Sequence, residues 1–346
     1  MTDTTAPPRR DSWLSRLLTG RSHIDFIGRS KLFAIVTAVT LTLCVLGLVV
    51  RGLNFSIDFT GGTAFTVTGA TAEFTADELR DALGEVGVDS SIVQVVDGGE
   101  GALVSTPALE EIGGDQQRQV LDTIARVTGA ERDAIDVSAV GPRWGEQITR
   151  QSLRGLAVFL VLVVAYIALR FEWRMGIAAL VTLLHDIAIT VGIYALVGFE
   201  VSPASVIAFL TILGYSLYDT VVVFDRVAED TGRLSSVSTV TYGDAANQGL
   251  NEVLVRSLST SATSILPVGS LLFIGANLLG ADTLSDLALA LLVGMAVGTY
   301  SSIVVATPIL VWLKEREPRW AELKRRVEAR RTPTAVPAAR QGTAPE

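Results

Sequence analysis

The sequence is poor in the residues that build metal centres and hydrolytic active sites. It contains one cysteine, Cys44, and two histidines, His23 and His185, in 346 residues. A single cysteine cannot form an intramolecular disulfide or a cysteine-based metal site, and two histidines argue against a histidine-rich metal centre. The sequence also lacks the G-x-x-x-x-G-K-[ST] phosphate loop and the H-E-x-x-H and G-x-S-x-G motifs of hydrolases. We therefore expect a protein that is not an enzyme and that needs neither a metal nor a cofactor.

Charged residues are also scarce. They make up 18% of the chain, whereas hydrophobic residues make up 49%, and the mean hydropathy of +0.45 is too high for an ordinary soluble protein of this length. A helix needs about 20 apolar residues to cross a hydrocarbon core of about 30 Å. Six stretches are long enough: 32–50, 152–170, 175–198, 203–223, 257–279 and 284–313. The expected fold is a polytopic α-helical membrane protein with six transmembrane helices.

Lysine and arginine indicate the orientation of these spans, because short cytoplasmic loops carry the excess of positive charge. Basic residues cluster in the leader 1–31, in the loop 224–256 and in the tail 314–346. We therefore place both termini in the cytoplasm and the acid-rich segment 52–150 on the opposite side. The leader is too long and too polar for a cleaved signal peptide, so the first span is expected to be a permanent anchor. The end of the tail, rich in Pro, Ala and Thr, is expected to be disordered.

The segment 52–150 has the pattern of a small extracytoplasmic α/β domain. Thr75 and Glu78 have the spacing of a capping box at the start of a helix, and a second helix is expected from Gln116 to Val127. Strand-like stretches lie at 63–68, 91–96, 102–105 and 136–140. Two helices among four strands in this order predict a ferredoxin-like β-α-β-β-α-β domain.

Asp219 lies inside the fourth span, where an acid is costly. An Asp at the centre of a spanning helix costs about 2.5 to 3.5 kcal/mol, so intramembrane acids usually face a protein interior, a water path or a partner charge. The helix geometry places Asp219 in the cytoplasmic half of the bilayer and His185 and Asp186 near the midplane on the neighbouring span. Arg256, at the start of the fifth span, is the candidate cation for Asp219. A carboxyl group balanced between desolvation and a nearby cation can carry a proton, and the membrane potential supplies about 2.3 kcal/mol per charge per 100 mV.

Each of these residues also has a purely structural interpretation. Polar side chains buried in helix bundles are often satisfied by Ser, Thr or backbone groups, which would make Asp219, His185 and Asp186 packing residues. An arginine at a helix end, such as Arg256, can extend to the headgroups and set the topology. In the last span, Gly294 and Gly298 have the small-residue spacing that lets two helices approach closely.

Four stretches, in their order and spacing, resemble the SecF family of protein-export membrane proteins. They are Asp58-Phe59-Thr60-Gly61-Gly62, Val140-Gly141-Pro142-Arg143-Trp144-Gly145, Leu184-His185-Asp186, and the run from Gly214-Tyr215-Ser216 to Arg226. The resemblance covers about residues 26–315, including the six spans and the large first loop. Members usually carry Asn where this chain has Tyr218.

The resemblance implies an accessory subunit of the secretion machinery in the bacterial cytoplasmic membrane, within the RND superfamily of proton-driven transporters. The implied partners are the six-span sibling SecD, the SecYEG channel, exported polypeptides and a membrane insertase, with no nucleic acid among them. Asp219 matches the family's proton-pathway acid, Arg256 its fifth-span arginine, and His185 and Asp186 a characteristic pair. Six spans supply one copy of a repeat that such transporters use in pairs, so the helix that faces Asp219 is expected on another chain.

Two other functions fit the same residues. A half-size RND exporter of lipids or small molecules could use the same acid, although such exporters usually have a second large loop and the connection 276–283 is short here. A passive scaffold of the translocase could use its buried acids only to hold helices together. The proton-coupled export subunit is the function that we expect.

Overall fold

The computed structural model describes residues 24–88, 90–109, 114–234, 239–274 and 282–331. Most of the leader 1–31, most of the connection 276–283 and the end of the tail lie outside the described residues. Within the described ranges, six helices are long and apolar enough to cross a membrane, which confirms the expected fold class.

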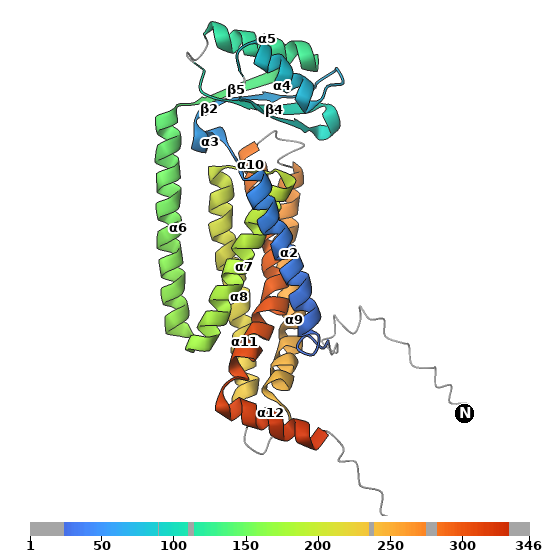
Figure 1. Cartoon of the computed structure of the whole chain (residues 1–346), viewed down its shortest axis with the longest axis vertical. Coiled ribbons are helices and arrows are strands. Elements are labelled where there is room, and N and C mark those ends of the chain that lie inside the picture. Colours follow the sequence, from blue (N-terminus) through green and yellow to red (C-terminus); the bar gives the residue numbers. More distant parts are fainter. Residues whose placement is uncertain (1–23, 89, 110–113, 235–238, 275–281, 332–346) are drawn as a thin grey trace, which may run out of the picture.

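Five of these helices form a bundle, and α6 stands to one side of it (Figure 1). The bounds are α2 (Ser30–Arg51), α6 (Pro142–Arg170), α7 (Trp173–Val197), α8 (Pro203–Gly232), α9 (Tyr242–Ile274) and α10 (Asp282–Ser301). The last span continues through a π-helical turn (Ser302–Ala306) into α11 (Thr307–Lys314). A further helix, α12 (Pro318–Arg331), crosses the end of the bundle far from the α/β domain.

Several helices extend well beyond the apolar stretches that mark them in the sequence. The helix α8 continues past residue 223 to Gly232, and α9 begins at Tyr242, so much of the segment 224–256 is helical. Their extensions bury apolar side chains such as Val227 and Leu250 in the same core as the membrane helices. Hydrophobic length therefore indicates the part of a helix that crosses the bilayer, whereas packing outside the bilayer decides where the helix ends.

The segment between α2 and α6 folds as the expected α/β domain. It comprises β2 (Gly62–Val67), α4 (Ala76–Glu85), β3 (Ile92–Val96), β4 (Gly101–Thr106), α5 (Asp115–Thr128) and β5 (Ile135–Val140). The four strands are antiparallel in the order β3-β4-β2-β5, the ferredoxin-like arrangement. The capping box at Thr75 and Glu78 is formed, and Gly129 ends α5 in the left-handed conformation. Phe65, Leu79 and Ile124 are among the residues of its closed apolar core.

Two short elements join this domain to the membrane bundle. The strand β1 (Asn54–Phe55) pairs in parallel with β6 (Glu200–Val201), which lies between α7 and α8. Directly after β1, the short helix α3 (Ile57–Thr60) carries Asp58 and packs against the start of α6. The connection between α7 and α8 therefore contacts the segment that leads from α2 into the α/β domain.

The two glycine motifs meet at this junction. Gly141 caps α6, Pro142 occupies its first turn, and a Cβ atom at Gly145 would lie 2.7 Å from the backbone oxygen of Phe59. Gly61 and Gly62 have φ angles of +71° and +143°, a range that favours glycine, and a Cβ at Gly62 would lie 2.3 Å from the backbone oxygen of Thr106. A side chain at Gly145 would therefore push α6 away from α3, and one at Gly62 would push β2 away from β4.

Candidate functional site

The carboxylate of Asp219 is held inside the bundle by hydroxyl groups from two other helices. Its side chain is on α8, and the residue is only 6% exposed. The Oγ atom of Ser257, on α9, lies 2.8 Å from Oδ1 and 2.7 Å from Oδ2 of Asp219. Ser302 Oγ also donates a hydrogen bond to Oδ2. These bonds replace part of the hydration that the carboxylate loses on burial.

Neither serine could be recognised from the sequence. Ser257 and Ser302 lie in largely apolar helices, where a serine adds little to the free energy of insertion and follows no characteristic spacing. Ser302 is the first residue of the π-helical turn between α10 and α11. Single π-helical turns within α-helices occur frequently at functional sites, and here the turn begins at the residue that binds Asp219.

A second buried carboxylate lies close to the first. Asp186, on α7, is 1% exposed; its Oδ2 atom accepts a hydrogen bond from Ser216, and Oδ1 lies 3.0 Å from Nδ1 of His185. Ser216 and Asp219 are three residues apart on α8 and therefore lie on the same side of that helix. The structure thus brings Asp219, Asp186 and His185 into one polar region around α8.

A group of three further polar side chains lies one helical turn nearer the α/β domain. Tyr215 OH donates to Ser261 Oγ at 3.2 Å, and Thr299 Oγ1 lies 2.8 Å from the same oxygen. These residues come from α8, α9 and α10, the helices that also supply the surroundings of Asp219. No spacing or motif in the sequence connects these three residues.

Arg256 does not join the site in this conformation. The residue is exposed, and among the described residues no hydrogen bond or ion pair connects it with Asp219. Consecutive residues on an α-helix point about 100° apart. Because Ser257 faces Asp219, the preceding side chain turns outward, so the expected pairing within one chain is not made here.

The glycines of the last span lie against α8. A Cβ atom at Gly294 would approach the side chain of Ile212 to 2.2 Å, and one at Gly298 would lie 3.0 Å from the Cβ atom of Ser216. Small residues at these positions allow α10 and α8 to pack closely. This contact holds Ser216 and the following turn of α8 beside the helix that leads to Ser302.

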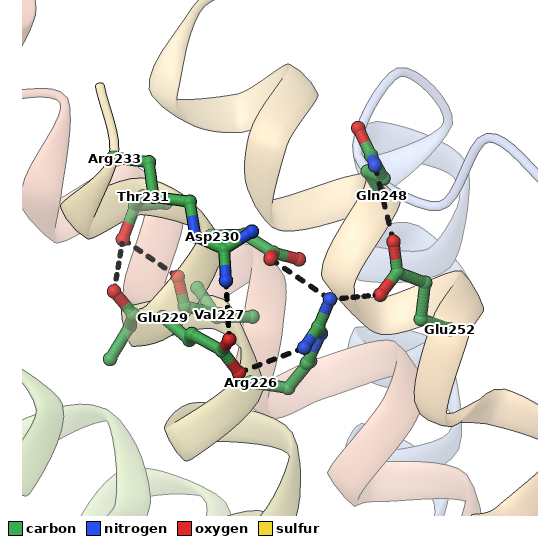
Figure 2. A network of polar contacts seen from close by, with 9 residues as sticks. Arg226, Val227, Glu229, Asp230, Thr231, Arg233, Gln248 and Glu252 are labelled. Atoms are coloured by element: carbon green, nitrogen blue, oxygen red, sulfur yellow. Dashed lines mark hydrogen bonds and ion pairs between the residues drawn. The ribbon is translucent and has the colours of Figure 1, made fainter. Parts of the chain in front are cut away.

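A network of charged side chains lies at the end of α8 and α9 far from the domain (Figure 2). Arg226 binds Glu229 at 2.8 Å and Asp230 at 3.1 Å, both on α8, and it also binds Glu252 on α9. Gln248 donates to the same Glu252 at 3.1 Å. The network therefore ties the two helices together. Within the described part of the chain, no three His, Cys, Asp or Glu side chains gather as metal ligands.

The chain matches known proteins over most of its length. Residues 120–316 match the family described as protein export membrane protein SecD/SecF, C-terminal, and residues 46–72 match the SecD/SecF GG motif. A protein translocase subunit SecF from Streptomyces coelicolor is 44% identical over 93% of this chain and 85% of the relative.

A longer relative and its crystal structure also match. The protein translocase subunit SecDF of Thermus thermophilus is 38% identical over 85% of this chain, which spans 39% of that protein's length. The crystal structure of SecDF, a translocon-associated membrane protein from Thermus thermophilus, superposes with a TM-score of 0.73 and 34% identity over 86% of this chain and 39% of the other. From its fold, its glycine motifs and these matches, the chain belongs to the SecF family of protein-export membrane proteins.

Proposed function

We propose that this chain is a non-enzymatic subunit of the Sec translocase that uses the proton motive force to promote protein export. The observation that carries the proposal is the buried carboxylate of Asp219, which is held by neutral hydroxyl groups. Such a group can take up a proton without breaking an ion pair. Intramembrane acids of this kind are typical of proton relays in pumps and transporters.

We further propose that His185 and Asp186 belong to the same proton pathway. Their hydrogen bond, together with the bond from Ser216, places a second protonatable pair beside α8. Imidazole side chains serve as proton shuttles in many proteins. In this proposal the pair responds to the charge on Asp219 across one turn of the helix.

The sibling subunit SecD is the partner proposed for the exposed side of α8. Ile207 is 60% exposed and Tyr218 is 59% exposed, and Thr211 and Gly214 lie on the same exposed stripe. The stripe recurs at helical spacing and borders Asp219, as expected for a face that packs against another helix. The SecDF relative, of which this chain spans 39%, supports a sibling in the same assembly. Arg256, exposed on α9, is then free to meet an acid of the sibling.

The remaining partners follow from the family. They are the SecYEG channel, exported polypeptides and a membrane insertase.

We propose that the chain is a multi-pass protein of the bacterial cytoplasmic membrane with both termini in the cytoplasm and the α/β domain outside. The basic helix α12 then lies at the cytoplasmic surface, in accordance with the positive-inside rule.

The proposal is tested with vesicles that contain the chain, SecD and the SecYEG channel. We expect Asp219→Asn to abolish the stimulation of secretory-protein release by an imposed proton gradient, since an amide cannot exchange the proton. Asp225→Asn is the matched control, because that carboxylate lies on the same helix but is exposed and pairs with Arg170. Undiminished stimulation in Asp219→Asn vesicles would refute the proton-coupled function.

The same vesicles separate the two competing functions. A scaffold whose acids only lock helices predicts that Asp219→Asn lowers the yield of the complex while the assembled complex still responds to the gradient. A half-size exporter predicts proton-driven movement of lipid or small molecules in vesicles without SecYEG. The proton-coupled translocase subunit predicts neither result.

A further inference from the structure

Three layers of side chains stack along the junction of α8, α9 and α10 with its continuation. The first, the carboxylate layer, consists of Asp219, Ser257 and Ser302, one residue from each helix. One turn toward the α/β domain lies the hydroxyl layer, formed by Tyr215, Ser261 and Thr299. One turn in the opposite direction lies the apolar layer, formed by Val223, Val253 and Ala306.

The spacing of the residues explains why the layers stack. Tyr215, Asp219 and Val223 follow one another at four-residue intervals on α8. Residues four apart on a helix lie on the same face, about one turn of 5.4 Å from each other. The same intervals separate the members on α9, and on the last span Ser302 follows Thr299 by three residues and precedes Ala306 by four. Of the two layers next to the carboxylate, the one on the domain side is polar and the other is apolar.

The hydroxyl layer can move a proton, and the apolar layer cannot. Each hydroxyl both donates and accepts a hydrogen bond, so a proton arriving at one oxygen releases another proton from the same group. The step of about 5.4 Å between the two polar layers is one that a single water molecule can bridge. The Oγ atom of Ser302, which binds Asp219, lies 3.2 Å from the backbone oxygen of Thr299, so Ser302 meets the backbone next to the hydroxyl layer and not one of its hydroxyl groups.

Two features lie between the carboxylate of Asp219 and the end of the bundle away from the domain: the apolar layer and the ion pair of Arg226 with Glu252. Val223 and Ala306 in the apolar layer are fully buried and offer no hydrogen bond through their side chains. Beyond this layer, Arg226 binds Glu252 and draws the ends of α8 and α9 together (Figure 2). Asp219 therefore has a polar layer next to it on the domain side and an apolar layer next to it on the other side.

We propose that Tyr215, Ser261 and Thr299 form a proton relay between the domain side of the membrane and Asp219, and that this conformation loads Asp219 from that side. The proposal rests on the proton-coupled function proposed above. Each hydroxyl gains one proton and passes its own toward Asp219. The relay is unchanged after the transfer, and the carboxylate has gained one proton. Release to the other side requires α8 and α9 to separate at the apolar layer.

The relay is tested by removing single hydroxyl groups without changing shape. The variants are Thr299→Val and Tyr215→Phe in vesicles that contain the assembled complex with SecD, with proton uptake followed by a pH-sensitive dye after a gradient is imposed from the domain side. We expect uptake to slow at least about tenfold, because positioned proton-transfer groups contribute about 10²- to 10⁴-fold and water replaces a lost hydroxyl only in part. Thr299→Ser, which keeps the hydroxyl, should restore the rate.

Two controls separate a relay from a packing effect. Thr182→Val removes a buried hydroxyl on α7 that bonds only to the backbone of its own helix, and should leave uptake unchanged. The infrared carboxyl band lost in Asp219→Asn should remain in Thr299→Val, because the relay changes the rate of protonation and not its equilibrium. Wild-type uptake in both relay variants would overturn the relay even where Asp219→Asn is inactive. Equal slowing under a gradient from either side would overturn the one-sided loading.

Discussion

The helices α8 and α6 are both apolar enough to cross a membrane, yet they face different surroundings. Half of the apolar stretch of α8 is buried in the protein, compared with 11% of that of α6. The buried helix carries Tyr215, Ser216 and Asp219, whereas α6 is apolar between its flanking arginines. Polar groups are kept where neighbouring helices supply hydrogen bonds. Burial against protein, which hydropathy does not measure, therefore distinguishes a helix that can carry a charge from one that can only anchor.

The largest effect is expected when a carboxylate is placed on α6, which has few neighbouring helices. Val161 lies at the middle of that span and is 67% exposed. We expect Val161→Asp to disfavour insertion by about 2.5 to 3.5 kcal/mol, because no neighbouring helix offers it hydroxyl partners. The fraction of chains with α6 inserted, measured by cysteine accessibility on both sides of the membrane, would show the loss, with Val161→Leu as the control. Normal insertion of Val161→Asp would mean that a protein partner or water covers this face.

Two glycines of α6 provide the next test. At its start, a Cβ on Gly145 would meet the backbone of Phe59 and Gly61, whereas Gly155 faces open space. We expect Gly145→Ala to destabilise the junction by about 1 to 3 kcal/mol, since backbone atoms cannot yield as a side chain can. Thermal unfolding, together with hydrogen exchange in α3, measures the effect. Gly155→Ala should be at least as stable as the wild type, since alanine is better than glycine in a helix by about 1 kcal/mol. Equal stability of the two variants would show that α6 is not fixed at this junction.

The contrast between these helices also shows what the sequence could predict. The six spans and Asp219 are visible because length and the cost of charge in hydrocarbon leave clear patterns. The partners of Asp219 are not visible: Ser257 and Ser302 lie in apolar helices without any distinctive spacing, and the π-helical turn depends on tertiary packing. The sequence predicts a pairing of Arg256 with Asp219, because both lie toward the cytoplasmic side of the membrane. The rotation of α9 about its own axis turns Ser257, and not Arg256, toward Asp219. That rotation depends on the packing of α9 against all of its neighbours, which the sequence does not reveal.

Close packing of α10 against α8 is expected to give an effect of similar size. A Cβ at Gly294 would press on the side-chain end of Ile212, which has some freedom to move, and one at Gly269 would meet no neighbour. Overpacking costs about 1 to 3 kcal/mol, and replacing a helical glycine with alanine regains about 1 kcal/mol. We therefore expect Gly294→Ala to be less stable than Gly269→Ala by about 1 to 3 kcal/mol, measured by thermal unfolding in detergent. Equal stability of the two variants would show that α8 and α10 do not pack closely at Gly294.

The smallest effect is expected for a charge pair outside the membrane helices. Lys324, on α12, lies 2.5 Å from Glu315, and this hydrogen bond raises the pKa of Lys324. The lysine side chain is 41% exposed, so solvent screens the pair, and Glu315→Gln should cost at most about 1 kcal/mol. Because the pKa is raised on folding, the stabilisation is complete below the unfolded value of about 10.4 and is lost as the pH rises through the folded value. Thermal unfolding should thus distinguish the variant from the wild type at pH 7 and not at strongly alkaline pH.

A difference in stability that does not depend on pH would instead assign the loss to the packing of Glu315. A loss of stability as large as that of Val161→Asp would contradict the view that burial sets the free-energy cost of a charged side chain.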